Sequence, residues 1–140
     1  MSVYLDASVL VALFTNDPYT DRADTFLRAN ALVLIVSDFA AAEFASVIVR
    51  HVRTRDITPN NARIAFSTFD AWTGRATQRT EIKAADVAAA EAFLRRLDLT
   101  LRTPDAVNIA IAQRIGATLV TFDDKMIASA GALGTPVAAA

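Results

Sequence analysis

Short apolar runs alternate along the chain with longer segments in which apolar residues recur at every third or fourth position. Continuous apolar runs are typical of strands covered on both faces of a sheet, whereas the spaced pattern is typical of amphipathic helices. The predicted strands are Val3–Leu5, Leu32–Val36, Thr77–Ile82, Thr118–Thr121 and a last short one at Val137. Strands that alternate with helices in this way predict an α/β sandwich around a parallel sheet of four or five strands.

The predicted helices begin and end at local signals. Thr58-Pro59 and Thr103-Pro104 each pair a hydroxyl cap with a proline suited to the first helical position. Gly74 and Gly116 are expected to end those two helices. The full set is Ser8–Phe14, Tyr19–Ala29, Ser37 or Asp38 to about Arg55, Thr58–Gly74, Ala84–Leu97, Thr103–Gly116 and Asp124 to about Ala132.

Length and composition predict one folded domain, residues 1–140. The chain has 140 residues, of which 54% are hydrophobic and 21% are charged, a balance that excludes intrinsic disorder. It contains no cysteine and a single histidine, His51, which excludes disulfides, cysteine-ligated metals and cysteine nucleophiles. The longest apolar runs, Val9–Phe14 and Ala31–Val36, are far shorter than the roughly 20 residues of a membrane span. Since Met1–Asp6 does not resemble a signal peptide, we expect a cytoplasmic protein that does not bind membranes.

Acidic residues stand where the predicted strands end. Asp6 directly follows the first strand, and Asp123 and Asp124 follow the strand near the end of the chain. Glu43 lies in the first turns of the helix after the second strand, and Asp105 lies in the first turn of its helix. Because ligands of open α/β sheets bind beyond the carboxyl ends of the strands, these acids are expected to share one crevice.

Several carboxylates in one crevice require neutralisation. Two like charges about 4 Å apart repel by about 4 kcal/mol at an effective dielectric constant near 20, so such a cluster persists only with protons or hard cations. Oxygen ligands alone favour Mg²⁺ or Mn²⁺, which activate water and stabilise the leaving oxygen in phosphodiester hydrolysis. Each acid taken alone also has a structural interpretation as a helix cap or a helix-dipole partner, and the pattern leaves both interpretations open.

Four short motifs carry a resemblance to a known family. They are Tyr4–Leu10, Ala42–Phe44, Arg102–Ala106 and Leu119–Asp123, followed by Leu133–Val137 as the closing strand. In this order and spacing the chain resembles the PIN-domain ribonucleases, and among them the VapC toxins of bacterial toxin–antitoxin pairs. The resemblance covers nearly the whole chain. It implies a PIN-like three-layer sandwich and an endoribonuclease that depends on Mg²⁺ or Mn²⁺.

The resemblance also implies roles for individual residues. The family's catalytic, metal-binding acids correspond to Asp6, Glu43, Asp105 and Asp123. Thr121 matches a hydroxyl position that orients a carboxylate, and Ser8 is expected to act similarly. Asp124 is expected to share or replace the role of its neighbour Asp123. Asn108 shares a helix face with Asp105 and either contacts a water on the metal or the substrate, or is an ordinary polar helix residue.

The resemblance further implies partners. Proteins of this family are usually homodimers, inhibited by a small VapB-like antitoxin whose C-terminal segment occupies the active-site groove. Their toxin–antitoxin complexes bind operator DNA through the antitoxin. The expected partners are therefore an RNA substrate, a small antitoxin, a second copy of the chain, and operator DNA only through the antitoxin. A basic antitoxin side chain would compete for the four acids.

The formal net charge of −1 gives no indication of a polyanion partner. One arginine, however, shares a helix face with one of the acids. Glu43 and Arg50 share one helix face, about 10 Å apart along the axis at 1.5 Å per residue. Arg50 is therefore predicted to bind a phosphate beside the scissile one, with a solvated helix face as the alternative. Phe66, Phe69 and Trp72 recur at helical spacing and form either core or subunit interface, or a surface that stacks bases.

Two other function classes remain open on the sequence. A non-catalytic interaction module would use the acids only to bind a cation or to cap helices. A receiver-type phosphorelay domain would need a phosphoacceptor aspartate at the end of a central strand, for which Asp38 is the candidate. Labelling by acetyl phosphate distinguishes the second class, and unchanged activity after substitution of Asp6 distinguishes the first.

Overall fold

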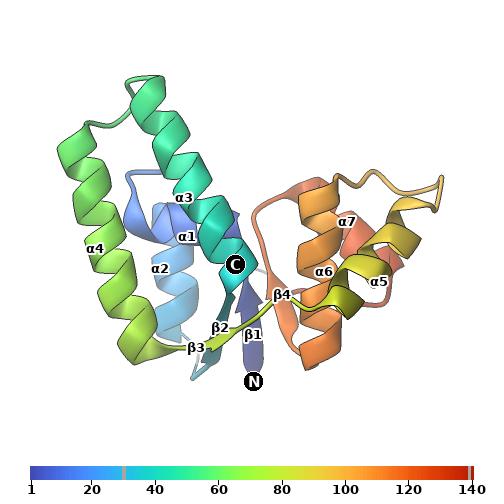
Figure 1. Ribbon diagram of the computed structural model, residues 1–140. Coiled ribbons are helices and arrows are strands. Elements are labelled where there is room, and N and C mark those ends of the chain that lie inside the picture. Colours follow the sequence, from blue (N-terminus) through green and yellow to red (C-terminus); the bar gives the residue numbers. More distant parts are fainter. Residues whose placement is uncertain (30, 139) are drawn as a thin grey trace.

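A fully parallel sheet of four short strands divides the molecule into three layers (Figure 1). The computed structural model describes residues 1–29, 31–138 and 140. Its strands are β1 (Ser2–Leu5), β2 (Val33–Ser37), β3 (Thr77–Thr80) and β4 (Thr118–Val120). They pair in the order β3-β2-β1-β4, so β1 and β2 occupy the centre of the sheet. The predicted α/β sandwich with a parallel sheet is confirmed.

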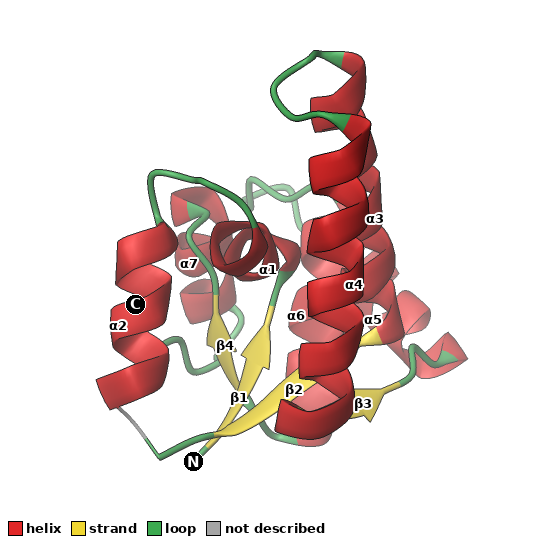
Figure 2. Cartoon of the chain, turned by 90° about the vertical axis from the view of Figure 1, so that its left-hand side faces the viewer, coloured by secondary structure: helices red, strands yellow, loops and turns green. Residues whose placement is uncertain are grey.

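Helices cover both faces of the sheet (Figures 1 and 2). On one face lie α1 (Ala7–Phe14), α2 (Thr20–Ala29), α3 (Asp38–Arg53) and α4 (Pro59–Ala76). On the other face lie α5 (Ala84–Leu94), α6 (Thr103–Ile115) and α7 (Asp124–Ala132). Within the described residues, every helix is too short or too polar to cross a membrane.

The central strand β1 sends alternate side chains into two separate cores. Val3 and Leu5 pack with Phe44 of α3 on one face, whereas Tyr4 packs with Ile109 of α6 on the other. All three β1 side chains have a relative exposure of 0%. Successive residues of a strand point to opposite faces, so burial on both sides requires the unbroken apolar run seen in the sequence.

Two of the strands predicted near the edges of the sheet differ from the prediction. The strand expected at Thr77–Ile82 exists as β3 and ends at Thr80. The expected last strand is reduced to a single parallel bridge between Leu119 and Val137. The sheet therefore has four strands, the lower of the two numbers expected.

Of the predicted helix boundaries, the caps Ser37 and Thr58 and the end at Gly116 are confirmed, whereas Gly74 and Thr103 were wrong. Gly74 does not end α4, because glycine inside a helix costs only about 1 kcal/mol and the helix continues to the start of β3. Thr103 is the first residue of α6 and not its cap, because Asp105 accepts the backbone N–H of Arg102 and caps the helix from within. Gly116 does end α6, with φ at +66° in the left-handed region that glycine adopts freely.

The helix predicted over Ala84–Leu97 was also partly wrong. Helix α5 ends at Leu94, and Leu97 lies beyond it with a relative exposure of 100%. Val87 is 53% exposed, while Ala90 is buried against α6. Alanine lets the two helices approach closely, so the larger apolar residues on the outer side of α5 are left in solvent.

The aromatic residues of α4 belong to the core. Phe69 stacks on Phe44 with ring centroids 4.6 Å apart, and Trp72 meets Phe14 edge-on at 5.3 Å. Phe66 packs against the same cluster. Phe69 is buried, and Phe66 and Trp72 are half-buried against the same cluster, so core packing, one of the interpretations of this stripe, is confirmed.

A buried carboxylate joins α5 to α6. Asp86 is 1% exposed and accepts hydrogen bonds from Arg114 at 2.7 Å and 3.0 Å and from the backbone N–H of Lys83 at 2.8 Å. Arg114 also donates to the carbonyl oxygen of Glu81 at 2.9 Å. One guanidinium thus connects α6 to the start of α5 and to the chain that leaves β3.

We expect Arg114→Ala to lower the free energy of unfolding by about 2 kcal/mol, because the Asp86 carboxylate stays buried without its charged donor. Urea denaturation measures the change. Arg95→Ala is the matched control, since the Arg95–Glu91 pair on α5 lies in solvent, and it should cost less than about 0.5 kcal/mol. Equal effects of the two substitutions would contradict the assigned role of Asp86.

Candidate functional site

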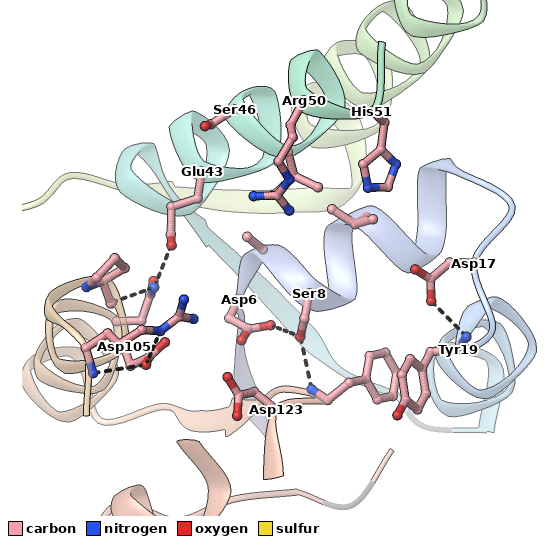
Figure 3. Close-up of a pocket in the computed structure, with 17 residues that line it drawn as sticks. Asp6, Ser8, Asp17, Tyr19, Glu43, Ser46, Arg50, His51, Asp105 and Asp123 are labelled. Carbon is pink, nitrogen blue, oxygen red and sulfur yellow. Dashed lines mark hydrogen bonds and ion pairs between the residues drawn. The ribbon is translucent and has the colours of Figure 1, made fainter. Parts of the chain in front are cut away.

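An open groove of about 600 Å³ lies beyond the carboxyl ends of β1 and β4 (Figure 3). The predicted site residues that line it are Asp6, Ser8, Glu43, Arg50, Asp105, Asn108 and Asp123. They come from the end of β1, from α1, α3 and α6, and from the β4–α7 connection. Thr121 is buried beside the groove, and Asp124 lines a neighbouring depression instead. The fold therefore brings all four predicted catalytic acids to one surface.

Asp6 is the only one of the four predicted acids that is buried, with a relative exposure of 5%. Its Oδ1 accepts hydrogen bonds from the Ser8 hydroxyl at 2.6 Å and from the backbone N–H of Val9 at 3.3 Å. Its Oδ2 accepts from the Thr121 hydroxyl at 2.5 Å. The backbone N–H of Phe122 in turn donates to Ser8 Oγ at 3.0 Å. The two hydroxyls thus hold the carboxylate in one orientation and tie the end of β4 to the start of α1.

Asp105 and Asp123 each serve a helix start while lining the groove. Asp105 Oδ2 accepts the backbone N–H of Arg102 at 3.3 Å and lies 3.5 Å from its guanidinium. Asp123 Oδ1 accepts the backbone N–H groups of Lys125 at 3.0 Å and Met126 at 3.2 Å. Among the described residues, the second oxygen of each carboxylate has no hydrogen-bond partner. Capping and ligand binding are therefore compatible in the same side chain.

A chain of buried hydrogen bonds leads to Glu43. The Asn108 amide nitrogen donates to Glu43 Oε1 at 2.6 Å, and its amide oxygen accepts the Tyr4 hydroxyl at 2.5 Å. Since the single hydroxyl proton of Tyr4 goes to Asn108, the Ser37 hydroxyl at 2.6 Å must donate to Tyr4. Ser37 Oγ accepts the backbone N–H of Ala40 at 2.9 Å. The chain fixes the Asn108 amide with its NH₂ group toward Glu43.

Sequence reasoning missed Tyr4 and Ser37 as parts of this site. A tyrosine inside a fully apolar strand was an available signal, because a buried phenolic hydroxyl requires a partner. Arg102, Asp17, Tyr19, His51 and Phe122 also line the groove and were not predicted to do so. Their place depends on how distant elements pack, and no local pattern marks it.

Two acids of the groove, Asp6 and Glu43, have strongly raised pKa values. Burial raises the pKa of Asp6 to about 6, against the opposing hydrogen bonds from Ser8 and Thr121. Burial raises the pKa of Glu43 to about 7, and the charges of Asp6 and Asp105 add to the shift, while the Asn108 hydrogen bond opposes it. The groove therefore favours whatever neutralises its acids, a proton or a cation.

The donor set fits a hard divalent cation. Within the described residues, no three His, Cys, Asp or Glu side chains converge closely enough to form a ready-made metal-binding group. Mg²⁺ does not require one, since it is commonly bound through one or two carboxylates, waters and substrate phosphates. The four predicted acids, and Asp17 beside them, line the groove and offer oxygen, the ligand that Mg²⁺ and Mn²⁺ prefer.

Comparison with known proteins gives consistent matches. The family model described as the PIN domain matches residues 3–132. Ribonuclease VapC46 of Mycobacterium tuberculosis is 30% identical over 142 residues, covering 99% of this chain and 97% of the relative. The crystal structure of M. tuberculosis VapC20, described as a Sarcin-Ricin loop cleaving toxin, superposes with a TM-score of 0.74 at 18% identity over 91% of this chain and 94% of that one. VapBC2 from Rickettsia felis, bound to a DNA fragment from its promoter, gives 0.72 at 16% identity over 99% and 98%.

We expect Tyr4→Phe to lower the free energy of unfolding by about 1–3 kcal/mol, because it leaves the buried amide oxygen of Asn108 without a donor. Urea denaturation measures the loss. Tyr19→Phe removes an exposed hydroxyl and should change stability by less than about 0.5 kcal/mol. If both substitutions have the same small effect, the hydrogen-bond chain does not stabilise the fold.

The pKa shifts predict a pH dependence of the metal-free protein. The unfolded chain titrates its Asp and Glu residues near 3.9 and 4.3, below the values of about 6 for Asp6 and 7 for Glu43 in the folded state. Between these limits the folded protein holds protons that the unfolded chain has released, so their contribution to stability falls as pH rises and is lost above about 7.

The measurement is the free energy of unfolding in a chelator between pH 4 and pH 8. We expect Asp6→Asn to flatten the decline between about pH 4 and 6, because it removes the titration assigned to Asp6. Identical pH profiles for the wild type and this variant would contradict the shifted pKa of Asp6.

Proposed function

Because the chain belongs to the PIN-domain family, we propose that it is a metal-dependent endoribonuclease that acts as the toxin of a toxin–antitoxin pair. The observation that carries the proposal is the convergence of four carboxylates from separate elements on one open groove. The match to a protein named as a ribonuclease over 99% of this chain supports RNA as the substrate. Family membership also removes the receiver-type alternative, and Asp38, its candidate phosphoacceptor, instead accepts the backbone N–H of Ile82 at 2.8 Å.

Each residue of the groove has a part in the proposed hydrolysis. Residues that would hold Mg²⁺ or Mn²⁺ are Asp6, Glu43, Asp105 and Asp123. When bound, such a cation supplies water activation and stabilises the leaving oxygen. Ser8 and Thr121 keep the Asp6 carboxylate in place, and Asn108 does so for Glu43. In the reaction, one bond forms from a water oxygen to phosphorus and one P–O bond breaks, with the leaving oxygen taking up a proton.

Arg50 supplies positive charge along the same groove. It is exposed on α3, on the face that carries Glu43, and Ser46 and His51 line the groove beside it (Figure 3). This placement supports its binding of a phosphate that flanks the scissile one, since an exposed guanidinium retains its donors for a phosphate.

The acidic groove also supports the proposed antitoxin. A basic side chain from a small VapB-like protein would neutralise the carboxylates in place of a cation and would exclude RNA. The R. felis neighbour, a VapBC assembly on promoter DNA, supports binding of operator DNA through that antitoxin. A homodimer and a cytoplasmic location complete the proposal.

The first experiment is cleavage of total host RNA with Mg²⁺ or Mn²⁺ and without them, followed by sequencing of all new 5′ ends. We expect metal-dependent ends from the wild type and a loss of at least about 100-fold in Asp6→Asn, because a misplaced or missing metal ligand costs at least that much. Asp70→Asn, an exposed position on α4 outside the groove, is the control and should cleave as the wild type does.

An absence of new ends would contradict the proposal, provided that the wild-type protein is folded and free of antitoxin. In that case the acids bind a cation or cap helices, and the protein is a non-catalytic interaction module. Activity that persists in Asp6→Asn and in chelator would instead exclude this groove as the site of hydrolysis.

The role of Arg50 is tested by RNA binding in the Asp6→Asn background, where the RNA stays intact. We expect Arg50→Ala to weaken binding across sequences and to reduce the slope of log affinity against log salt by about one, the signature of one lost phosphate contact. Arg63→Ala removes an exposed arginine of α4 that bonds Asn60 outside the groove, and should leave the slope unchanged. Equal slopes for both variants would exclude Arg50 as a phosphate ligand.

A further inference from the structure

The hydrogen-bond chain that reaches Glu43 begins in the core and not in the groove. Tyr4, near the middle of β1, has a relative exposure of 0% and packs in the core between the sheet and α6. Its hydroxyl accepts the hydroxyl of Ser37, the N-cap residue of α3, and donates to Asn108 Oδ1 at 2.5 Å. The chain therefore links the buried centre of the sheet to Glu43, which lines the groove (Figure 3).

The side-chain amide of Asn108 is held from three directions. Its oxygen accepts the Tyr4 hydroxyl, and its nitrogen donates to Glu43 Oε1 at 2.6 Å and to the carbonyl oxygen of Pro104 at 3.0 Å. An amide nitrogen carries two N–H groups, so both donors are used. The oxygen faces the buried Tyr4, and Asn108 itself is only 2% exposed. This arrangement favours an action of Asn108 on Glu43 over direct contact with a ligand in the groove.

Glu43 keeps one carboxylate oxygen for a ligand. Oε1 accepts the Asn108 amide, whereas Oε2 accepts no hydrogen bond among the described residues. A glutamate side chain loses conformational entropy when a ligand fixes it in one rotamer. The bond to Asn108 restricts the side chain before a ligand arrives, so less entropy remains to be lost on binding. The affinity of Glu43 for a cation should thus depend on where Asn108 is held.

We propose that Tyr4 is a positioning residue that, through Asn108, holds Glu43 for the divalent cation. This inference rests on the proposed function, in which Glu43 is a metal ligand. Without the Tyr4 hydroxyl, the buried amide oxygen of Asn108 has no donor, and the amide gains by rotating toward water in the groove. That rotation withdraws its N–H from Glu43. Strand β1 then serves two acids, Asp6 directly at its end and Glu43 through Tyr4.

The test measures Mn²⁺ binding to the RNA-free protein, from the electron paramagnetic resonance signal of free Mn²⁺. We expect Tyr4→Phe to weaken binding about 10-fold, the lower end of the range for residues that support metal ligands. Arg114→Ala is the matched control. It also removes a buried hydrogen bond, on the far side of α6 from this chain of bonds, and should leave the Mn²⁺ affinity unchanged.

A double-mutant cycle separates positioning from a general loss of stability. Asn108→Ala should weaken Mn²⁺ binding by at least about 10-fold, and adding Tyr4→Phe to it should cause no further loss, because Tyr4 acts through the amide. Thr121→Val removes a donor to a different carboxylate, Asp6. Its effect and that of Tyr4→Phe should therefore multiply in the double variant.

A second measurement leaves Tyr4 intact. The chain contains two tyrosines, so Tyr19→Phe leaves Tyr4 as the only one. In this protein labelled with ¹³C-tyrosine, the ring signals of Tyr4 should shift when Mg²⁺ is added. Asn108→Ala should abolish most of that shift, because it removes the link between Tyr4 and Glu43.

Cleavage assays test the same role through the metal requirement. Tyr4→Phe should need about 10-fold more Mn²⁺ for half-maximal cleavage, in line with its weaker binding. Saturating Mn²⁺ should restore the cleavage rate, since the buried hydroxyl does not touch RNA. A rate that stays low at every Mn²⁺ concentration would contradict positioning for the metal.

The outcomes separate the two proposals. If the wild type binds Mn²⁺ and cleaves RNA, but Tyr4→Phe binds Mn²⁺ as tightly, the positioning role is wrong and the ribonuclease stands. Equal weakening by Arg114→Ala, or equal weakening by Tyr4→Phe with and without Asn108, would likewise overturn the positioning role. If the wild type neither binds Mn²⁺ nor cleaves RNA, both proposals fail together.

Discussion

The buried carboxylate of Asp6 is the contact on which the site depends. It ends the central strand β1, caps α1 through the N–H of Val9, and accepts the hydroxyls of Ser8 and Thr121 from two different elements. An enclosed carboxylate without these donors would be strongly destabilising, so the fold must keep β1, α1 and the end of β4 in register around it. Even with them, burial raises the pKa of Asp6 to about 6. The hydrogen bonds that hold this end of the sheet together therefore enclose an acid whose pKa is raised, and a proton or a cation would neutralise it.

Capping and ligand binding are compatible in this groove, because capping uses only one oxygen of each carboxylate. Asp123 caps α7 with one oxygen, and Asp105 caps α6 with one oxygen, although both line the groove. A helix N-terminus also carries partial positive charge, which lowers the cost of gathering acids beside it. The sequence offered capping and metal binding as alternative explanations, and the geometry accommodates both.

The groove carries different kinds of side chain on the two sides of its acids. Arg50 on α3 offers charge at one side, whereas Tyr19, which stacks on Phe122, lines the groove at another (Figure 3). The aromatic rings of α4, for which the sequence left base stacking open, instead pack into the core around Phe44.

The sequence by itself determined the parallel α/β architecture, most helix starts and the placement of four acids at strand ends and helix starts. This was possible because a strand buried on both faces, and the point where it ends, can be recognised from consecutive residues. Only the tertiary structure decided which partners those residues meet. The Tyr4–Asn108 bond spans 104 positions and the Thr121–Asp6 bond spans 115, and the Tyr19–Phe122 stack likewise joins opposite ends of the chain. The converse holds at Leu97, since the sequence placed it in a helix, whereas α5 ends at Leu94 and Leu97 is fully exposed beyond it. Local periodicity encodes which face of an element is apolar, whereas contacts between distant segments depend on how whole elements pack, which no stretch of consecutive residues contains.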